Sequence, residues 1–161
     1  MTSYASPAAY LSHRPPMLLL STVLSIEAES VRCETELGEK GPLAPFANDK
    51  GEVGTEFFVE LMAQTIGVWA GDMNQQHPEA TAAENPLADI GLLLSVRQAK
   101  FMVKAVPATG TLTIDMRKLL QEGQLATFEG EVYHGETLCA QGRITVYQPH
   151  QAELDALFSH G

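Results

Sequence analysis

Two polar side chains with the spacing of an acid–base pair interrupt an otherwise apolar stretch of the sequence. Between Phe57 and Ala70 the polar side chains are Glu60, Gln64 and Thr65. In a helix, Glu60 and Gln64 lie on the same face one turn apart, because they are four residues apart. A carboxyl group among apolar side chains is expected to be partly desolvated, which favours its neutral, proton-carrying form. The pair therefore predicts an acid–base site in which Glu60 exchanges a proton and Gln64 orients it.

The same residues also have a structural interpretation. Glu60 in the first turns of a helix can be stabilised by the helix dipole and by solvent, with Gln64 as a structural hydrogen-bonding side chain. A second feature of chemical interest is the helix start at Gly54 and Thr55, where free backbone N–H groups could hold a carbonyl oxygen as negative charge develops. Almost every helix start offers such groups, so this signal alone does not distinguish a site from a scaffold.

The other reactive residue types form no second site in the sequence. His13, close to the amino terminus, is interpreted as structural rather than catalytic. Cys33 and Cys139 lie far apart in alternating segments, where a cysteine usually acts as a small apolar filler. The remaining histidines lie in loop, turn or tail segments without metal-ligand spacing: His77, His134, His150 and His160. There is no nucleophile-elbow motif and no phosphate-binding glycine loop, so neither a metal nor a cofactor is expected.

Periodicity predicts the elements that would position the pair. A helix is expected over residues 55–75, with Thr55 as the N-cap and Glu56 in the first turn, where a negative charge meets the positive end of the helix dipole. This helix is apolar nearly all round, so other structure must cover most of its faces. Strands are expected within 17–37, 90–101, 111–116, 128–132 and 143–147, and loops over 39–54 and 75–89.

The order of these elements is strands, one buried helix and then a run of antiparallel strands. A curved antiparallel sheet wrapped round the helix is the compact solution, since the helix needs cover and the sheet needs one dry face. The sequence therefore predicts the α+β class and the hotdog architecture. A single domain is expected over 1–161, with its core at about 10–148, an irregular lead-in and a short helix at 150–158.

The composition argues against two classes of partner. The chain carries 10 Lys and Arg against 20 Asp and Glu, a formal net charge of -10. Nucleic-acid binding and docking on anionic membranes both draw on clustered basic residues, so neither is expected. No signal peptide opens the chain, and no apolar run approaches the ~18–20 residues that cross a bilayer. A cytoplasmic protein is expected.

Several motifs resemble those of a known family. The segment LSHRPPMLLL at 11–20 resembles the opening LPHRxPxLLLD of beta-hydroxyacyl-(acyl carrier protein) dehydratases of the FabZ and FabA type. ELMAQ at 60–64 resembles their helix motif EAMAQ, whose acidic residue works on the substrate hydroxyl. PFANDKG at 45–51 and VELMAQTI at 59–66 look more like the ApeP-type branch of aryl polyene biosynthesis. This resemblance implies a hotdog fold and dehydration of a 3-hydroxyacyl thioester on an acyl carrier protein.

One position departs from that family pattern. The dehydratases carry a histidine base on the loop before the helix, and Phe46 stands at the corresponding position here. A phenyl ring cannot take a proton. Because the family's active site lies at a dimer interface, with His from one subunit and the acid from the other, the resemblance implies a homodimer or a heterodimer. In a heterodimer Glu60 would work with a histidine of another hotdog subunit. A homodimer would hold two sites without that base. Phe46, Gly54 and Thr55 are expected to line the substrate site.

Three functions remain open on the sequence. The first is a dehydratase subunit, the second a hotdog thioesterase in which Glu60 activates water, and the third a non-catalytic partner of an active dehydratase. The basic segment that contains Arg97, Lys100 and Lys104 is expected to dock the carrier protein, which is acidic in this family. A strand edge with solvated charges is the alternative interpretation of that segment.

Overall fold

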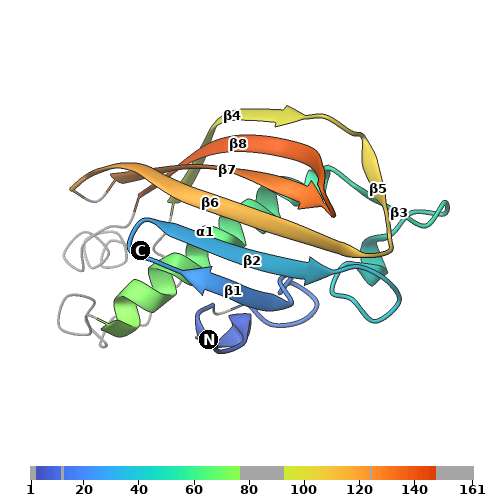
Figure 1. Ribbon diagram of the computed structural model, residues 1–161, viewed down its shortest axis with the longest axis horizontal. Helices are drawn as coiled ribbons and strands as arrows, with labels where there is room; N and C mark the ends of the chain where they lie inside the picture. Colours follow the sequence, from blue (N-terminus) through green and yellow to red (C-terminus); the bar gives the residue numbers. More distant parts are fainter. Residues whose placement is uncertain (1–2, 12, 77–92, 124, 148–161) are drawn as a thin grey trace, which may run out of the picture.

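A long helix in the curve of one antiparallel sheet makes up most of the fold. The computed structural model describes residues 3–11, 13–76, 93–123 and 125–147. Helix α1 (Glu56–Gln76) lies along the inner face of a six-stranded sheet with strand order β1-β2-β6-β7-β8-β4 (Figure 1). The strands of this sheet are β1 (Thr22–Ile26), β2 (Ser30–Glu36), β4 (Leu93–Phe101), β6 (Thr111–Glu122), β7 (Leu125–His134) and β8 (Thr137–Tyr147). The predicted α+β class and hotdog architecture are confirmed.

The structure differs from the predicted elements in several places, and β6, β7 and β8 are longer than the segments 111–116, 128–132 and 143–147 expected for them. The strand-like segment 17–37 divides into β1 and β2, because a turn closes where the Glu27 N–H donates to the Ser30 carbonyl. The predicted loop over 39–54 contains a 3-10 turn, η2 (Ala44–Phe46), and the strand β3 (Glu52–Gly54). β3 pairs with β5 (Ala105–Pro107) in a small second sheet. Strands of three residues are too short to show alternation, which is why the sequence did not predict them.

Two further predicted elements fall mostly on residues that the structure does not describe. The loop expected over 75–89 begins inside α1, which runs to Gln76, and the rest of it lies outside the described residues. The short helix expected at 150–158 also lies outside them. In the lead-in, which was expected to be irregular, Pro7–Ala9 forms the 3-10 turn η1 with Pro7 at its first position.

The core lies between α1 and the inner face of the sheet. In β6 the residues Leu112, Ile114 and Met116 are fully buried, while the residues between them are partly exposed. Successive side chains in a strand point to opposite faces, so this alternation places one side of β6 against the helix. The side chains of α1 that fill the same core are all fully buried: Phe58, Leu61, Met62 and Ile66.

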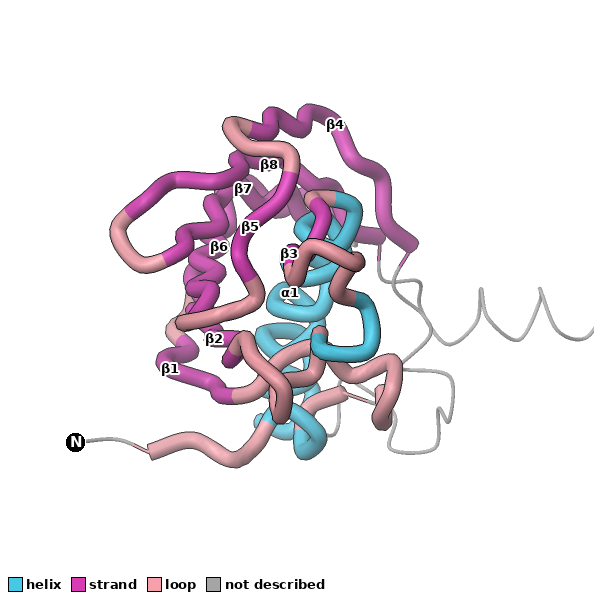
Figure 2. Tube along the Cα trace, turned by 90° about the vertical axis from the view of Figure 1, so that its right-hand side faces the viewer, coloured by secondary structure: helices cyan, strands magenta, loops and turns pink. Residues whose placement is uncertain are grey.

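Strand β4 is an edge strand without cover on either face. It pairs with β8 alone in this sheet, and all residues at 95–100 are exposed. Figure 2 shows β1 and β4 at opposite ends of the curve that the sheet makes round α1. Apolar side chains on and just after β4 are also exposed, with Val96 at 47%, Phe101 at 43% and Met102 at 42%. An uncovered ladder edge of this kind is a surface on which another strand can pair.

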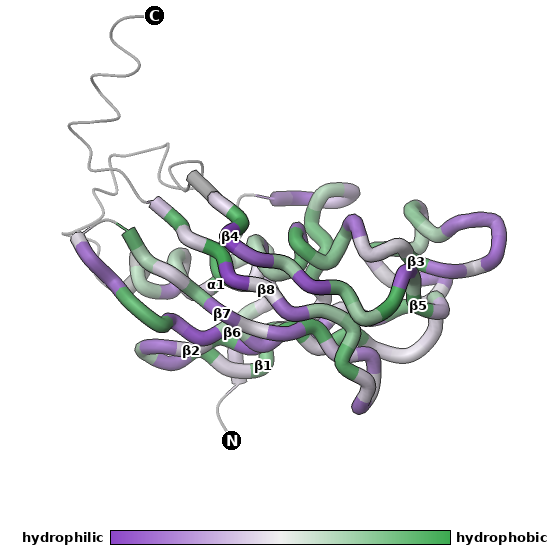
Figure 3. The backbone as a smooth tube through the Cα atoms, turned by 90° about the horizontal axis from the view of Figure 1, so that it is seen from above, coloured by the Kyte–Doolittle hydropathy of each residue, from purple (hydrophilic) through white to green (hydrophobic). Residues whose placement is uncertain are grey.

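The outer face of the sheet is a solvated, charged surface. Arg32 on β2 donates to Asp115 on β6 at 2.8 Å, and Arg143 on β8 donates to Glu129 on β7 at 3.1 Å. Hydrophilic stretches recur along β4 and β8 in Figure 3. Such cross-strand pairs contribute about 0.2–1 kcal/mol each. Their main effect here is to keep the outer face polar.

Candidate active site

Gln64 is the most connected polar side chain near the predicted acid. It is 2% exposed, and its Oε1 accepts a hydrogen bond from the Leu19 N–H at 3.0 Å. Its Nε2 donates to the Met17 carbonyl at 2.8 Å and to Oε1 of Glu60 at 3.0 Å. The contact between Glu60 and Gln64 is the one that their spacing indicated. Gln64 therefore holds the carboxyl group of Glu60 while binding the helix to the segment before β1.

Glu60 is half-buried within this chain. Its side chain is 44% exposed, although Phe58 and Leu61 on either side of it are fully buried. The sheet covers the side of α1 that carries these apolar residues, and Glu60 lies on another side. The partial desolvation expected from its sequence neighbours stays a prediction, because Glu60 does not lie on the fully buried side of the helix and keeps part of its side chain in solvent.

His13, interpreted from the sequence as structural, lies beside Glu60. Its Nε2 is 3.8 Å from Oε1 of Glu60, and its side chain is 36% exposed. His13 Nδ1 is buried and has no hydrogen-bond partner among the described residues. The sequence contains one signal that another segment could pack closely on this helix, which is the pair Gly67 and Gly71 four residues apart on α1. A side chain at either position would collide with the segment that leads to His13.

The three residues expected to line the substrate site lie around the first turn of α1. The Phe46 ring packs against Phe57, with ring centroids 5.1 Å apart. The Thr55 carbonyl accepts from the Phe58 N–H at 3.0 Å. The carboxylate of Glu56 folds back over Gly54, where an added Cβ would overlap its Oε2. The helix start is therefore faced by a negative charge of this chain itself.

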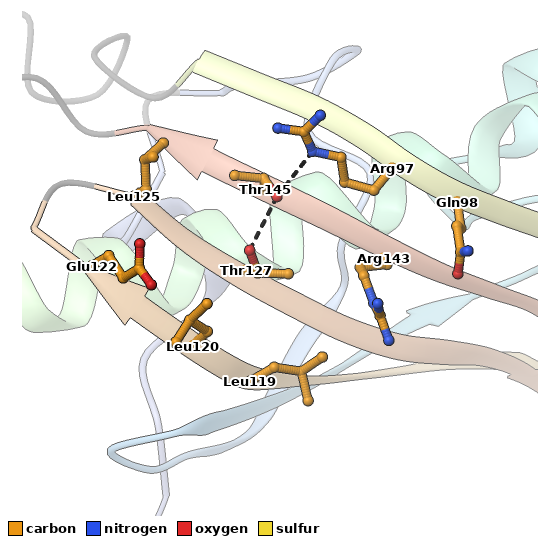
Figure 4. Close-up of a pocket in the computed structure, with 9 residues that line it drawn as sticks. All are labelled: Arg97, Gln98, Leu119, Leu120, Glu122, Leu125, Thr127, Arg143 and Thr145. Carbon is orange, nitrogen blue, oxygen red and sulfur yellow. Dashed lines mark hydrogen bonds between the residues drawn. The ribbon is translucent and has the colours of Figure 1, made fainter.

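The predicted basic segment lies on the uncovered edge of the sheet. Arg97 interrupts the register of β4 with β8, so that Arg97 and Gln98 both line one groove on the outer face (Figure 4). Arg97 Nε donates to Thr145 Oγ1 at 3.4 Å, and the Thr145 and Thr127 hydroxyls are 3.1 Å apart. Two more exposed basic residues follow along the chain, Lys100 on β4 and Lys104 in the turn before β5.

Burial disfavours the reactive thiolate form of both cysteines. Burial raises the pKa of Cys33 to about 12 although the Thr65 hydroxyl opposes the shift, and burial also raises the pKa of Cys139. Both thiols are buried, as expected for apolar fillers.

The described residues hold no group of three or more His, Cys, Asp or Glu side chains that could bind a metal ion. In the same part of the chain no helix is long and apolar enough to cross a membrane.

The curved sheet, the enclosed helix and the carboxyl group on that helix define a protein of the hotdog class. Residues 5–159 match the ApeP-like family, described as ApeP dehydratase, and the chain belongs to this family. No match was found among curated protein sequences.

Solved structures agree with this assignment. The chain is similar to a protein in the dehydratase heterocomplex ApeI:P from Xenorhabdus doucetiae, with 33% identity, a TM-score of 0.78 and coverage of 96% of this chain and 97% of that chain. It is also similar to the uncharacterized protein PH1136 from Pyrococcus horikoshii, with 18% identity, a TM-score of 0.60 and coverage of 96% and 100%. A hypothetical thioesterase from Streptococcus pneumoniae TIGR4, solved with coenzyme A, has 14% identity, a TM-score of 0.54 and coverage of 80% and 88%. The last two show the fold alone.

Proposed function

We propose that the chain is the acid-bearing subunit of a two-subunit dehydratase, which removes water from a 3-hydroxyacyl thioester on an acyl carrier protein in aryl polyene biosynthesis. The observation that supports this most directly is the exposed carboxyl group of Glu60, held through one oxygen by Gln64, in a chain of the ApeP-like dehydratase family. A carboxyl group fixed in this way can meet a substrate hydroxyl from the open side of the helix.

The proposed reaction needs two positioned groups. A base removes the proton from the carbon next to the thioester, the C–C double bond forms, and the C–O bond to the hydroxyl breaks. Glu60 protonates the departing hydroxyl, so water leaves and Glu60 remains as a carboxylate. The product is a trans-2-enoyl thioester. Phe46 cannot serve as the base, and we propose that a histidine of a second hotdog subunit does.

The position of the free edge supports a partner at this place. Gly142 of β8 lies against Met62, because an added Cβ would be 2.8 Å from the Met62 sulfur. Gly142 is also the register partner of Ala99 on β4. The uncovered strand β4 therefore runs level with the turn of α1 that carries Glu60. A second hotdog subunit that pairs along β4 would form hydrogen bonds with the unpaired backbone groups of this edge. It would also bring its own residues close to that turn. The solved relative belongs to the ApeI:P heterocomplex, which supports the presence of a second subunit.

The test compares the purified chain with its complex with a histidine-bearing hotdog partner. The complex should form enoyl thioester from a 3-hydroxyacyl carrier at ordinary enzyme rates of ~1–10³ s⁻¹. The chain alone should be slower by about 10²–10⁴-fold, which is the typical contribution of one positioned base. Equal rates for the chain and the complex would contradict the proposal. Release of free thiol instead of enoyl product would indicate the thioesterase alternative.

We also propose that Arg97, Lys100 and Lys104 dock the acidic carrier protein. Reversing Arg97→Glu and Lys100→Glu together should weaken carrier binding by slowing association, and should reduce its salt dependence, because exposed charges act mainly through steering. Titrations at several salt concentrations measure both effects. The control is Arg32→Glu on β2, which also reverses an exposed cation but is separated from β4 by the strands β6, β7 and β8. Unchanged affinity and salt dependence in the double variant would show that these charges are only solvated.

A further inference from the structure

We propose that His13 is a positioning residue for Glu60. The imidazole Nε2–H and the Gln64 amide together hold the carboxyl oxygen Oε1, so that Oε2 is the oxygen that carries the proton to the departing hydroxyl. This inference rests on the proposed function of Glu60 as the acid. It assigns a role to a residue of the lead-in, and it specifies which oxygen of the carboxyl group reacts.

The polar contacts of the Glu60 carboxyl group are made with one of its two oxygens. Gln64 Nε2 is 3.0 Å from Oε1, and His13 Nε2 is 3.8 Å from the same oxygen. Both contacts that the described part of the chain makes with this carboxyl group are to Oε1. The separation from His13 is longer than a hydrogen bond, but hydrogen bonds in active sites without substrate are often long and tighten in the substrate complex. With Oε1 engaged twice, Oε2 is the oxygen left for a proton and a ligand.

Two glycines of α1 allow the segment before His13 to pack directly on the helix. At Gly71 an added Cβ would overlap the Tyr10 carbonyl oxygen, and at Gly67 it would lie 2.7 Å from the Leu11 side chain. Tyr10 and Leu11 are themselves buried, at 9% and 8% exposure. The chain therefore runs along α1 in direct contact with it and reaches Glu60 at His13. The placement of the imidazole depends on packing along two turns of the helix.

The chain after His13 is fixed as well. Arg14 Nη1 donates to the carbonyl oxygens of Leu11 at 2.8 Å and His13 at 2.7 Å, which ties the main chain at these residues to the Arg14 side chain. A few residues later, Met17 and Leu19 are held by Gln64. His13 thus lies between two anchored segments, and both anchors are on the helix that carries its carboxylate neighbour.

The surroundings of the two ring nitrogens indicate which of them carries the proton. Nε2 faces a carboxyl oxygen, which accepts hydrogen bonds, whereas Nδ1 is buried without a partner among the described residues. A proton on Nδ1 would leave a buried donor unpaired and would turn the lone pair of Nε2 toward a carboxylate. A proton on Nε2 turns a donor toward the carboxyl oxygen and leaves Nδ1 as an unpaired acceptor, so the contact with Glu60 favours this tautomer. In this tautomer His13 donates to Glu60, and its Nε2 is not free to remove a proton from the substrate.

The test uses the two-subunit complex with His13→Ala and His13→Gln. The first variant should lower kcat by about 10–100-fold, the loss expected for one hydrogen bond to a charged group, with KM changed less than about twofold. The second should recover most of kcat, because the Gln amide can place a donor near the position of Nε2. Gly71→Ala, which does not touch Glu60, should lower kcat in the same direction by displacing the segment that carries His13. His134→Ala, at the end of β7 where the imidazole contacts the Thr109 carbonyl, is the control and should not change kcat.

Three results would overturn the inference. A change in kcat of less than twofold for His13→Ala would remove the role of His13. A loss of about 10²–10⁴-fold that His13→Gln does not rescue would identify His13 as the base instead. The ring nitrogen resonances of His13 in labelled complex should report a protonated Nε2, and a protonated Nδ1 would also contradict the inference. The nitrogen spectrum does not depend on turnover, so it tests the assigned tautomer of His13 separately from the role of Glu60 as the acid.

Discussion

Replacing Glu60 by Gln in the two-subunit complex should lower enoyl thioester formation by about 10²–10⁴-fold, with the complex still folded and assembled. The substitution preserves the size of the side chain, and its amide oxygen can still accept the hydrogen bond from Gln64. It removes only the ability to give a proton to the departing hydroxyl. Because that transfer occurs in the transition state, kcat should fall while KM stays close to that of the unmodified complex.

The measurement is the rate of product formation from a saturating 3-hydroxyacyl carrier, together with the mass of the purified complex. Glu136→Gln in the exposed turn between β7 and β8 removes an equivalent charge away from α1 and should leave the rate unchanged. If Glu60→Gln retains turnover within a few-fold, the chain is a non-catalytic partner. In that case the third function left open by the sequence is the correct one.

The largest effect on stability is expected at Phe128, where β7 packs on the helix. Phe128 is fully buried, and its ring meets the Trp69 ring edge-on with centroids 5.2 Å apart. Phe128→Ala removes this contact and leaves a cavity that the surrounding sheet cannot close. The free energy of unfolding should fall by about 3–5 kcal/mol. For a chain of this size, that corresponds to a Tm lower by roughly 6–20 °C.

Thermal unfolding of the protein measures the Tm, and denaturant unfolding of the same preparation measures the free energy of unfolding independently. Leu120→Ala is the matched control, because Leu120 is an apolar residue of the same sheet that is 54% exposed. It should change the free energy of unfolding by less than about 0.5 kcal/mol. A similar loss in both variants would mean that the sheet and the helix do not pack as described.

The fold could be predicted because its main elements are long and strongly patterned. The apolar segment that became α1 had too few polar residues to lie on a surface, and the alternation in β6 indicated a sheet with one dry face. The short pair β3 and β5 was missed, since its stability comes from contacts between residues far apart in the sequence. One of these is the pairing of Val53 with Val106. Local periodicity contains no information about such contacts.

The site was predictable only where its residues share one helix. Glu60 and Gln64 are four apart on α1, so helical geometry alone brings them together. His13 reaches the same carboxyl group because its segment lies on Gly67 and Gly71, and nothing in a single sequence indicates which loop packs on which glycine. The exposed fraction of Glu60 could not be predicted for a related reason. The composition of the helix shows which residues neighbour Glu60 in the chain. It does not show which side of the helix the sheet covers.

The uncovered strand β4 has a consequence for how the protein must be produced in a cell. A chain made without its partner would present an unpaired ladder edge with Val96, Phe101 and Met102 exposed beside it. Such an edge recruits other copies into aggregates, and exposed apolar surface attracts chaperones and proteases. If the partner pairs there, the steady-state level of this chain will follow the supply of that partner. Matched synthesis of the two subunits then becomes a condition for keeping either at a useful concentration.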